Sequence, residues 1–231
     1  MENEGRSVYA SVMLKALLFD LDGTLADTNP VHRATWTTFL EPYGYDVTWD
    51  FYRDNISGRV GQEMVLDLFP ELSPEKAQEM ADAKDAEFRE RAGELEALPG
   101  LRDLVEKGKE KGMRMALVTN APEENVLAVL RALNLEGVFE TVILADDVGA
   151  GKPDPAPYNA ALEAFELSPE EALAFEDSPS GIASSIAAGI PTVGIASTQD
   201  REDLEELGVE LVVRDFTNPK LSALIEDDQG F

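Results

Sequence analysis

Residues 14–25 read LKALLFDLDGTL, and this stretch decides the fold that the rest of the chain can adopt. Its apolar run ends abruptly at two carboxylates, Asp20 and Asp22, which are followed by Gly23 and Thr24. A short apolar run with such an end predicts a buried strand of a parallel sheet. Because ligands bind at the carboxyl ends of strands in open α/β sheets, we expect both carboxylates to lie at a ligand site.

Two neighbouring carboxylates repel each other and need a partner if they leave water. A divalent cation is the obvious partner, and it makes the pair useful in catalysis. One carboxylate then acts as a nucleophile while the other moves protons. Gly23 permits a tight turn that brings backbone amides close to an anion. The ordinary alternative is a strand end followed by a solvated, Asp-rich turn.

The composition argues against several classes of partner. The 231 residues include 46 acidic and 19 basic ones, a formal net charge of −27, so we expect neither nucleic acid nor an anionic membrane as a partner. There is no cysteine and a single histidine, His32, which disfavours thiolate and multi-histidine zinc sites. A metal here has to be held by oxygen, which points to Mg²⁺. The N-terminal residues lack an apolar signal core, and no apolar run is long enough to span a bilayer, so we expect a cytoplasmic protein.

Beyond Gly100 the sequence alternates apolar, strand-like runs with helical segments. We predict strands at residues 113–118, 141–145, 172–175, 192–195 and 211–213. Strands that alternate with helices form right-handed βαβ units, whose parallel sheet is covered on both faces. The predicted fold class is therefore α/β.

Residues 29–98 behave differently, because they show helical periodicity and no convincing strand. Trp36 and Trp49 are expected in the apolar core of this block. We therefore predict an all-α domain at residues 29–98, inserted into an α/β core domain that is formed by residues 1–28 and 99–231.

Polar groups recur beside the later predicted strands. Thr119 and Asn120 follow one strand, where a hydroxyl and nearby amides can hold a phosphoryl oxygen. Glu176 and Asp177 follow another strand, and two adjacent acids again need a cation. Lys152 lies in a loop whose glycines and prolines fix the backbone. Taken singly, these groups have ordinary explanations as a helix cap, a surface turn and a solvated lysine.

Taken together, four strings of residues resemble the motifs of the haloacid dehalogenase-like hydrolases, most of which are phosphatases. The string FDLDGTL at 19–25 resembles the first motif, Thr119 the second, GKPDP at 151–155 the third and EDSPSGI at 176–182 the fourth. The resemblance covers residues 14–195 and implies a Rossmann-like parallel sheet of strand order 3-2-1-4-5. It also implies that the helical block is the family's inserted cap, which closes over small substrates and excludes water.

By this resemblance Asp20 is the nucleophile that forms an aspartyl-phosphate, and Asp22 is the general acid and base. Thr119 and Lys152 hold the phosphoryl oxygens, and Lys152 offsets the negative charge of the nucleophile and the phosphate. The dehalogenases of the family lack an acid at the position of Asp22, so Asp22 favours phosphoryl transfer over dehalogenation.

The resemblance also implies a Mg²⁺ site and further contacts with the phosphate. The metal ligands are expected to be the Asp20 carboxylate, the backbone carbonyl of Asp22 and the Asp177 carboxylate. Glu176 is expected to support the metal directly or through water. Additional substrate contacts are expected from Gly23, Thr24 and Asn120.

The cap offers His32, Arg59 and Lys84 as side chains that would face the cleft and bind substrate. His32 and Lys84 stand where β-phosphoglucomutases carry the same residue types. Lys84 also suits a solvated helix face, and His32 also suits a place in the packing of the cap. Ser57 and Gly61 replace a lysine and an arginine that the mutases use to hold a second phosphate.

The leading functional prediction is a Mg²⁺-dependent phosphatase that acts on a small phosphorylated metabolite, such as a sugar phosphate or a phosphoglycolate-like compound. The alternative is a sugar phosphomutase of the β-phosphoglucomutase type. A third hypothesis is a binding protein without catalysis, which the presence of all four motifs disfavours. We expect a monomer or a weak homodimer.

Overall fold

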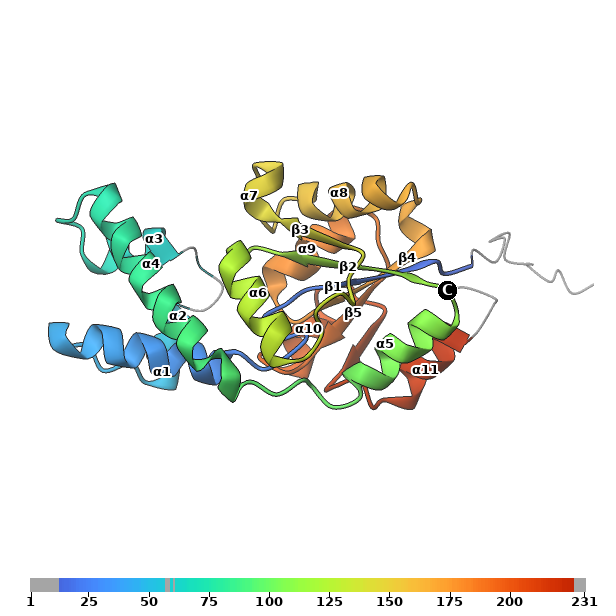
Figure 1. Cartoon of the computed structure of the whole chain (residues 1–231), viewed down its shortest axis with the longest axis horizontal. Helices are drawn as coiled ribbons and strands as arrows, with labels where there is room; N and C mark the ends of the chain where they lie inside the picture. The colour runs from blue at the N-terminus through green and yellow to red at the C-terminus, as the bar shows by residue number, and fades with distance from the viewer. Residues whose placement is uncertain (1–12, 57–58, 60, 227–231) are drawn as a thin grey trace, which may run out of the picture.

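The computed structural model describes residues 13–56, 59 and 61–226, so Ser57 and the first twelve residues of the predicted core domain lie outside the described part. Within that part, six parallel strands form one sheet of order β3-β2-β1-β4-β5-β6 (Figure 1). The predicted order 3-2-1-4-5 is confirmed, and a sixth strand extends the sheet at one edge. The strands are β1 (Ala16–Phe19), β2 (Arg114–Thr119), β3 (Thr141–Leu144), β4 (Ala172–Glu176), β5 (Thr192–Ile195) and β6 (Leu211–Val213).

Strand β1 lies inside the sheet because all four of its residues are apolar and can be buried on both faces. Its side chains alternate between the two faces. Leu17 and Phe19 join one apolar cluster, whereas Ala16 and Leu18 join another on the opposite face. This alternation fixes the register of the strand, since a slip of one residue would exchange the two sets.

The register of β1 places Asp20 level with the ends of two neighbouring strands. Phe19 lies opposite Leu117 of β2 and Phe175 of β4. The backbone amide of Asp20 donates to the Phe175 carbonyl at 3.0 Å, which holds the first residue after the strand in place. Asp20 therefore emerges where the carboxyl ends of the strands meet.

Helices cover both faces of the sheet (Figure 1). Side chains of α5, α6 and α11 pack in the cluster around Phe19, and side chains of α8 pack in the cluster on the other face. None of the helices that the structure describes is long and apolar enough to cross a membrane. The core helices are α5 (Leu101–Glu110), α6 (Glu123–Ala132), α7 (Ala145–Val148), α8 (Ala156–Phe165), η3 (Pro169–Glu171), α9 (Pro179–Ala187), α10 (Arg201–Glu205) and α11 (Pro219–Glu226).

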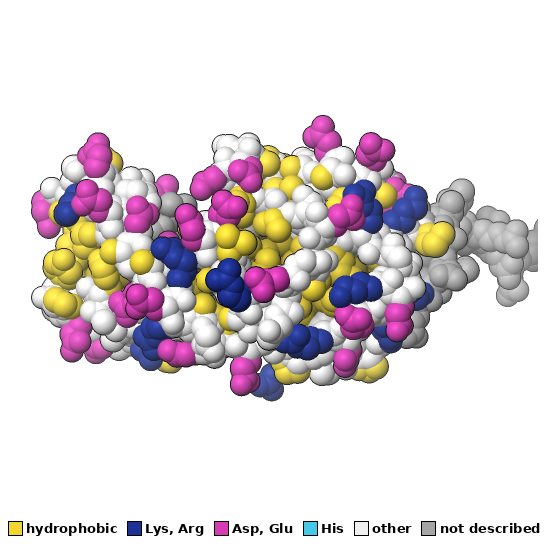
Figure 2. All heavy atoms as spheres, viewed as in Figure 1, with side chains coloured by type: hydrophobic (Ala, Val, Ile, Leu, Met, Phe, Trp, Pro, Cys, Tyr) yellow, Lys and Arg dark blue, Asp and Glu magenta, His cyan; other side chains and the backbone are white. Residues whose placement is uncertain are grey.

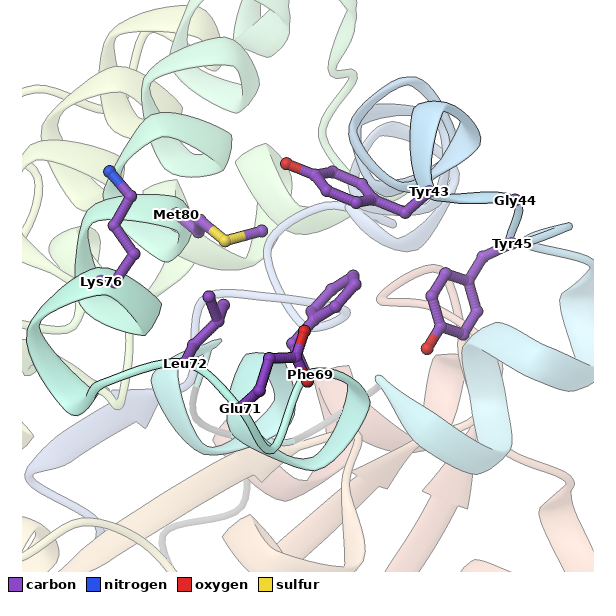
Figure 3. Close-up of a pocket in the computed structure, with 8 residues that line it drawn as sticks. All are labelled: Tyr43, Gly44, Tyr45, Phe69, Glu71, Leu72, Lys76 and Met80. Atoms are coloured by element: carbon purple, nitrogen blue, oxygen red, sulfur yellow. The ribbon is translucent and has the colours of Figure 1, made fainter.

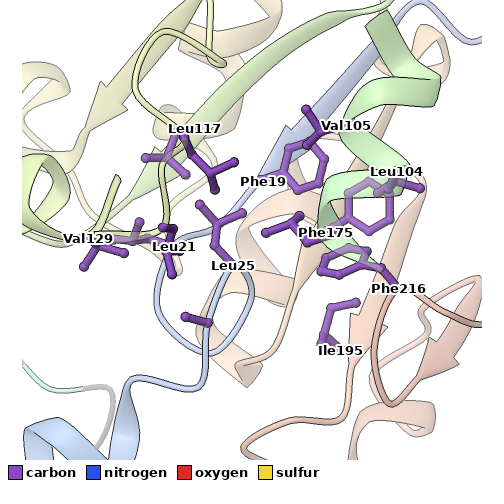
Figure 4. Packing of buried hydrophobic residues seen from close by; sticks show 14 of the residues in the cluster. Phe19, Leu21, Leu25, Leu104, Val105, Leu117, Val129, Phe175, Ile195 and Phe216 are labelled. Carbon is purple, nitrogen blue, oxygen red and sulfur yellow. The ribbon is translucent and has the colours of Figure 1, made fainter. Parts of the chain in front are cut away.

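Three aromatic rings form the centre of the cluster beneath the predicted site (Figure 4). The ring of Phe19 stacks on that of Phe175 with 4.8 Å between centroids, and Phe216 meets Phe175 edge-on at 5.5 Å. Such contacts add to the free energy gained from apolar burial alone. The residues directly before Asp20 and Glu176 are thus anchored by packing on one another.

Between β1 and α5 the described chain forms helices, namely α1 (Asn29–Leu40), η1 (Glu41–Tyr43), α2 (Trp49–Asn55), α3 (Gly61–Leu68), α4 (Pro74–Arg91) and η2 (Ala92–Glu94). Helices α1 to α4 share an apolar cluster of their own that includes Trp36, Leu40 and Met64, whereas Ala92 of η2 packs in the cluster around Phe19. Trp36 is buried, as expected. Figure 2 shows acidic side chains spread over both this helical cap and the sheet-containing core on the face in view.

The expectation that Trp49 belongs to the apolar core of the cap is wrong, because 51% of its surface is exposed. It is the first residue of α2, and its ring meets Tyr52 edge-on at 6.0 Å. The guanidinium of Arg33 lies 4.6 Å from the centroid of the Trp49 ring. A cation over an aromatic face is a favourable arrangement at an exposed position, so this tryptophan is held without being buried.

Two chain crossings connect the cap with the core, and they lie side by side. Ala26 and Ala97 form an isolated antiparallel bridge, and the amide of Leu98 donates to the carbonyl of Leu25 at 2.9 Å. Helix α4 and the turn η2 pack against α6 of the core. The division of the chain into domains at 29–98 stays a prediction.

We expect Phe175→Ala to lower the free energy of unfolding by about 3–5 kcal/mol, because truncation leaves a cavity between Phe19 and Phe216. The measurement is urea denaturation followed by circular dichroism. Leu127→Ala is the matched control, since Leu127 is 51% exposed on α6 and its truncation should change stability by no more than ~0.5 kcal/mol. Equal losses in the two variants would contradict the packing role of Phe175.

Candidate active site

Three buried carboxylates meet at the ends of β1 and β4. Asp20 follows β1, Glu176 ends β4, and Asp177 follows it. Each offers one oxygen, and these three oxygens all lie within 4.8 Å of one another. Their side by side placement follows from the pairing of the two strands, because the carboxyl ends of parallel neighbours lie at the same edge of a sheet.

The ammonium of Lys152 lies within the same cluster and is itself buried. Its Nζ lies 2.6 Å from Asp20 Oδ1 and 2.6 Å from Glu176 Oε1, and it donates to the Val118 carbonyl at 2.7 Å. An ammonium has three N–H donors, so three acceptors on β2, β4 and the residue after β1 use all of them. Lys152 is therefore a site residue and no solvated loop lysine.

Asn120 holds the loop that carries Lys152. Its Oδ1 accepts from the Lys152 amide at 2.9 Å, and its Nδ2 donates to the Lys152 carbonyl at 3.2 Å. The carboxamide thus pairs with both backbone groups of one residue, as a neighbouring strand would. Asn120 was predicted to contact substrate, and that role stays a prediction beside the backbone pairing that the structure gives it.

Burial and mutual repulsion perturb the carboxylates. Burial raises the pKa of Asp20 to about 7, against the opposing effect of the Lys152 ammonium. Burial, together with the charges of Asp20 and Glu176, raises the pKa of Asp177 well above its ordinary value. Burial opposes the charge of Lys152, but Asp20 and Glu176 outweigh it and raise the pKa of the lysine. One ammonium does not balance three acids, so the cluster favours an additional cation.

The residues at this site fit a divalent cation. Glu176 Oε2 is buried and has no hydrogen-bond partner, which leaves a carboxylate oxygen available to a cation. The donors are all carboxylate oxygens, the type that Mg²⁺ prefers. Asp20, Glu176 and Asp177 would hold the ion, and the backbone carbonyl of Asp22 stays a predicted ligand.

The side chain of Asp22 turns toward the cap. Its Oδ1 lies 3.4 Å from His32 Nε2, and His32 Nδ1 lies 3.1 Å from the ammonium of Lys84. Because an ammonium only donates, His32 Nδ1 accepts and Nε2–H points to Asp22. The imidazole stacks on the Phe88 ring with 4.0 Å between centroids, which fixes its plane. His32 therefore joins the cap to the core rather than serving only in cap packing.

The contacts of His32 with Lys84 and Asp22 affect the pKa values of both His32 and Asp22. Burial and the nearby Lys84 charge lower the pKa of His32, which favours the neutral imidazole. Burial is the largest single effect and acts to raise the pKa of Asp22, but the hydrogen bond with His32 and the smaller effects of the other neighbours together outweigh it, and the net pKa is lowered. Asp22 thus stays ionised next to the cluster.

Lys84 does not lie on a solvated helix face, so that alternative is wrong. It is buried, and it donates to Asp85 Oδ1 at 2.8 Å in addition to its contact with His32. Arg59 lies elsewhere in the cap, where it is exposed and pairs with Asp67. Its expected contact with substrate stays a prediction.

Two hydroxyl residues of the predicted phosphate site are buried. Thr119 accepts a hydrogen bond from the Ala121 amide at 3.0 Å, which leaves its hydroxyl proton free to donate. Thr24 Oγ1 is buried without a hydrogen-bond partner. Both hydroxyls are therefore available to an oxygen of a ligand, and the expected contacts of Thr119 and Thr24 with a phosphoryl group stay predictions.

The loop after β5 contributes two residues that sequence reasoning missed. Thr198 donates to Asp177 Oδ2, and Ser197 donates to the carbonyl of Gly23. Gly23 has a φ of 79°, and a Cβ on it would collide with the Asp177 carboxylate. No motif marked this loop, because single hydroxyl residues after a strand are common in any sequence.

A hollow of about 370 Å³ lies in the cap and is lined by Tyr43, Gly44, Tyr45, Phe69, Glu71, Leu72, Lys76 and Met80 (Figure 3). None of these residues belongs to the carboxylate cluster or contacts it in the described structure. Lys76 pairs with Glu79 at 2.6 Å, so its charge is already compensated. The hollow is therefore separate from the site at the strand ends.

With this geometry in place, comparison with known proteins identifies the family. The sequence model of the haloacid dehalogenase-like hydrolases matches residues 17–195, from β1 to the end of β5. The chain belongs to this hydrolase family. The match spans all four predicted motifs, so the resemblance that the sequence suggested is confirmed.

Individual relatives cover most of the chain. A phosphorylated carbohydrates phosphatase of Thermotoga maritima is 34% identical over 205 residues, which cover 87% of this chain and 94% of the relative. Protein CbbY of Rhodobacter capsulatus is 34% identical over 221 residues, which cover 91% and 95%. A crystal structure of CbbY from Rhodobacter sphaeroides with xylulose-1,5-bisphosphate superposes with a TM-score of 0.79 at 27% identity, covering 89% of this chain and 96% of that one. The predicted class, a phosphatase-type hydrolase, agrees with these relatives and is confirmed.

A glycine of α9 makes room for the cluster, and this leads to a prediction. A Cβ on Gly181 would overlap the Glu176 carboxylate, so Gly181→Ala should displace Glu176 and lower the free energy of unfolding by about 1–3 kcal/mol. Urea denaturation measures the effect. Gly93→Ala is the control, because a Cβ there meets nothing within 4 Å. A Gly181→Ala variant as stable as the control would refute the close approach.

Proposed function

We propose that this protein is a Mg²⁺-dependent phosphatase that hydrolyses a small phosphorylated carbohydrate through an aspartyl-phosphate on Asp20. The observation that carries the proposal is the position of Asp20: a buried carboxylate, 2.6 Å from the Lys152 ammonium and beside two further acids. A bound Mg²⁺ would neutralise charge on the carboxylates and on the phosphoryl group.

Lys152 and Thr119 position the nucleophile and the phosphoryl group in the proposed reaction. Lys152 holds Asp20 Oδ1 and so orients the Asp20 carboxylate for in-line attack on phosphorus. The hydroxyl proton of Thr119 is available for a phosphoryl oxygen, and Lys152 offsets the charge of the nucleophile. These contacts position the phosphoryl group at the ends of β1 and β2.

Asp22 moves the protons. The lowered pKa of Asp22 favours its carboxylate form, which accepts a proton from the water that hydrolyses the aspartyl-phosphate. To protonate the leaving oxygen in the first step, Asp22 must itself take up a proton, and a weaker hydrogen bond with His32 would favour this, because that bond lowers the pKa of Asp22. This ties the chemistry of the core to the position of the cap.

The substrate class comes from the cap and the relatives. A helical cap that packs on α6 and reaches Asp22 through His32 suits a small substrate and would exclude water. The relatives named above are a phosphatase of phosphorylated carbohydrates and a protein crystallised with a sugar bisphosphate. A phosphorylated carbohydrate is therefore the class we propose for this chain.

We expect Asp20→Asn to reduce phosphate release by more than about 1000-fold, because an amide does not attack phosphorus. The assay is a panel of sugar phosphates with Mg²⁺, read as free phosphate, with and without EDTA. Asp103→Asn, an exposed change in α5, is the control and should keep full activity. A folded Asp20→Asn variant with near wild-type turnover would refute the mechanism, and full activity after chelation would refute the metal requirement.

A sugar phosphomutase is the second candidate, and the burial of Lys84 beside His32 favours it, since the mutases carry these two residue types. A mutase also needs basic groups in the cap for a second phosphate, and at residues 57 and 61 this chain has serine and glycine. We therefore expect phosphate release to exceed isomerisation.

The test supplies β-glucose 1-phosphate, Mg²⁺ and a trace of the 1,6-bisphosphate, and it measures glucose 6-phosphate and free phosphate in the same samples. We expect free phosphate to be the main product, because serine and glycine at residues 57 and 61 do not supply the basic groups that hold the second phosphate while a bisphosphate reorients. The no-enzyme sample corrects for spontaneous hydrolysis. If glucose 6-phosphate formed many times faster than phosphate, the mutase would replace the phosphatase.

A further inference from the structure

A buried tyrosine of α8 contacts the carboxylate cluster and has no part in the proposed chemistry. We infer that Tyr158 is a positioning residue for Glu176, whose carboxylate it orients so that one oxygen is left for the divalent cation. This inference rests on the proposed function and adds to it a residue outside the four sequence motifs.

The hydroxyl of Tyr158 reaches the cluster from within the apolar core. The residue is fully buried and packs with Ala16, Leu18 and Val118 on one face of the sheet. Its hydroxyl donates to Glu176 Oε1 at 2.7 Å. A hydroxyl brought this deep into an apolar cluster requires a partner, and its partner here is itself a fully buried carboxylate.

The two oxygens of Glu176 have different surroundings. Oε1 receives both the Tyr158 hydroxyl at 2.7 Å and the Lys152 ammonium at 2.6 Å. Oε2 is buried and has no hydrogen-bond partner. The protein donors therefore occupy one oxygen and leave the other, which retains its capacity to bind a cation.

The terminal torsion of a glutamate is soft, so this asymmetry has to be imposed by its neighbours. Lys152 alone does not impose it, because its ammonium is shared with Asp20 and the Val118 carbonyl. On another side, Gly181 offers no side chain, and a Cβ there would overlap the carboxylate. The Tyr158 hydroxyl, Lys152 and the backbone of α9 together confine Glu176 to one orientation.

The decisive variant is Tyr158→Phe, which removes one oxygen and keeps the buried ring. Outer partners of metal ligands affect metal affinity by about 10–100-fold when they are removed. We expect the half-saturating Mg²⁺ concentration to rise by about 10-fold or more. It is measured twice: by the thermal shift of the substrate-free protein against Mg²⁺, and by phosphate release against Mg²⁺. At saturating Mg²⁺ the KM for the sugar phosphate should stay unchanged.

A merely structural role of the hydroxyl would lower the melting temperature without changing the Mg²⁺ dependence. Tyr45→Phe is the matched control, because it removes a hydroxyl that donates to the Leu68 carbonyl at 3.0 Å within the cap. In a Glu176→Gln background, Tyr158→Phe should produce little further change in half-saturation, since the group that it orients has been altered. This second comparison keeps the test independent of any loss of stability.

The outcomes separate the two proposals. If the wild type requires Mg²⁺ and Tyr158→Phe shows the same half-saturation, the inference about Tyr158 fails and the proposed function stands. If the wild type shows neither a Mg²⁺-dependent thermal shift nor Mg²⁺-dependent phosphate release, the proposed function fails and takes this inference with it.

Discussion

The site depends on the interaction of one buried ammonium with the ends of three adjacent strands. Lys152 Nζ contacts the carbonyl of Val118 on β2, the carboxylate of Asp20 after β1 and the carboxylate of Glu176 on β4. A buried carboxylate without a compensating charge costs several kcal/mol, so the two acids are stable here only with a cation between them. The lysine therefore fixes both the spacing of the strand ends and the orientation of the Asp20 carboxylate, the group that we propose as the nucleophile.

Because Lys152 must reach all three strand ends, the loops around the site are held by several hydrogen bonds. The carboxamide of Asn120 pairs with the backbone of Lys152 at both its amide and its carbonyl, so the ammonium enters from a fixed loop. Asp177 accepts from Thr198, and the Gly23 carbonyl accepts from Ser197. A small displacement of a catalytic group costs much of its effect, which makes such support as necessary as the reacting atoms themselves.

The cap is coupled to this cluster through a second set of polar contacts. His32 lies between Asp22 of the core and Lys84 of α4, and its imidazole stacks on Phe88. A further link joins Arg89 of α4 to Asn125 of α6 at 3.0 Å. Any movement of α4 therefore changes the hydrogen bonding of the group that we propose to transfer protons.

The strand order was implied by the resemblance to the hydrolase family. The sequence by itself determined the strands, the inserted helices and the polar groups at the strand ends. It did so because apolar periodicity reflects burial, and because residues that end neighbouring parallel strands necessarily meet. Asp20, Glu176 and Asp177 were predicted in this way, whereas Lys152, which lies 132 positions from Asp20, was singled out in a loop by the resemblance to the third motif of the family.

Only the tertiary structure decided which ordinary-looking residues serve the site. Tyr158 and Thr198 carry no local signal, since their roles arise from contacts with Glu176 and Asp177 across the fold. Lys84 and Trp49 show that residue type alone does not decide burial either. A charged helix residue is buried because His32 and Asp85 satisfy it, and a tryptophan is held at an exposed position by the guanidinium of Arg33 over its ring. Local pattern specifies what a segment prefers, whereas the partners that decide burial come from packing.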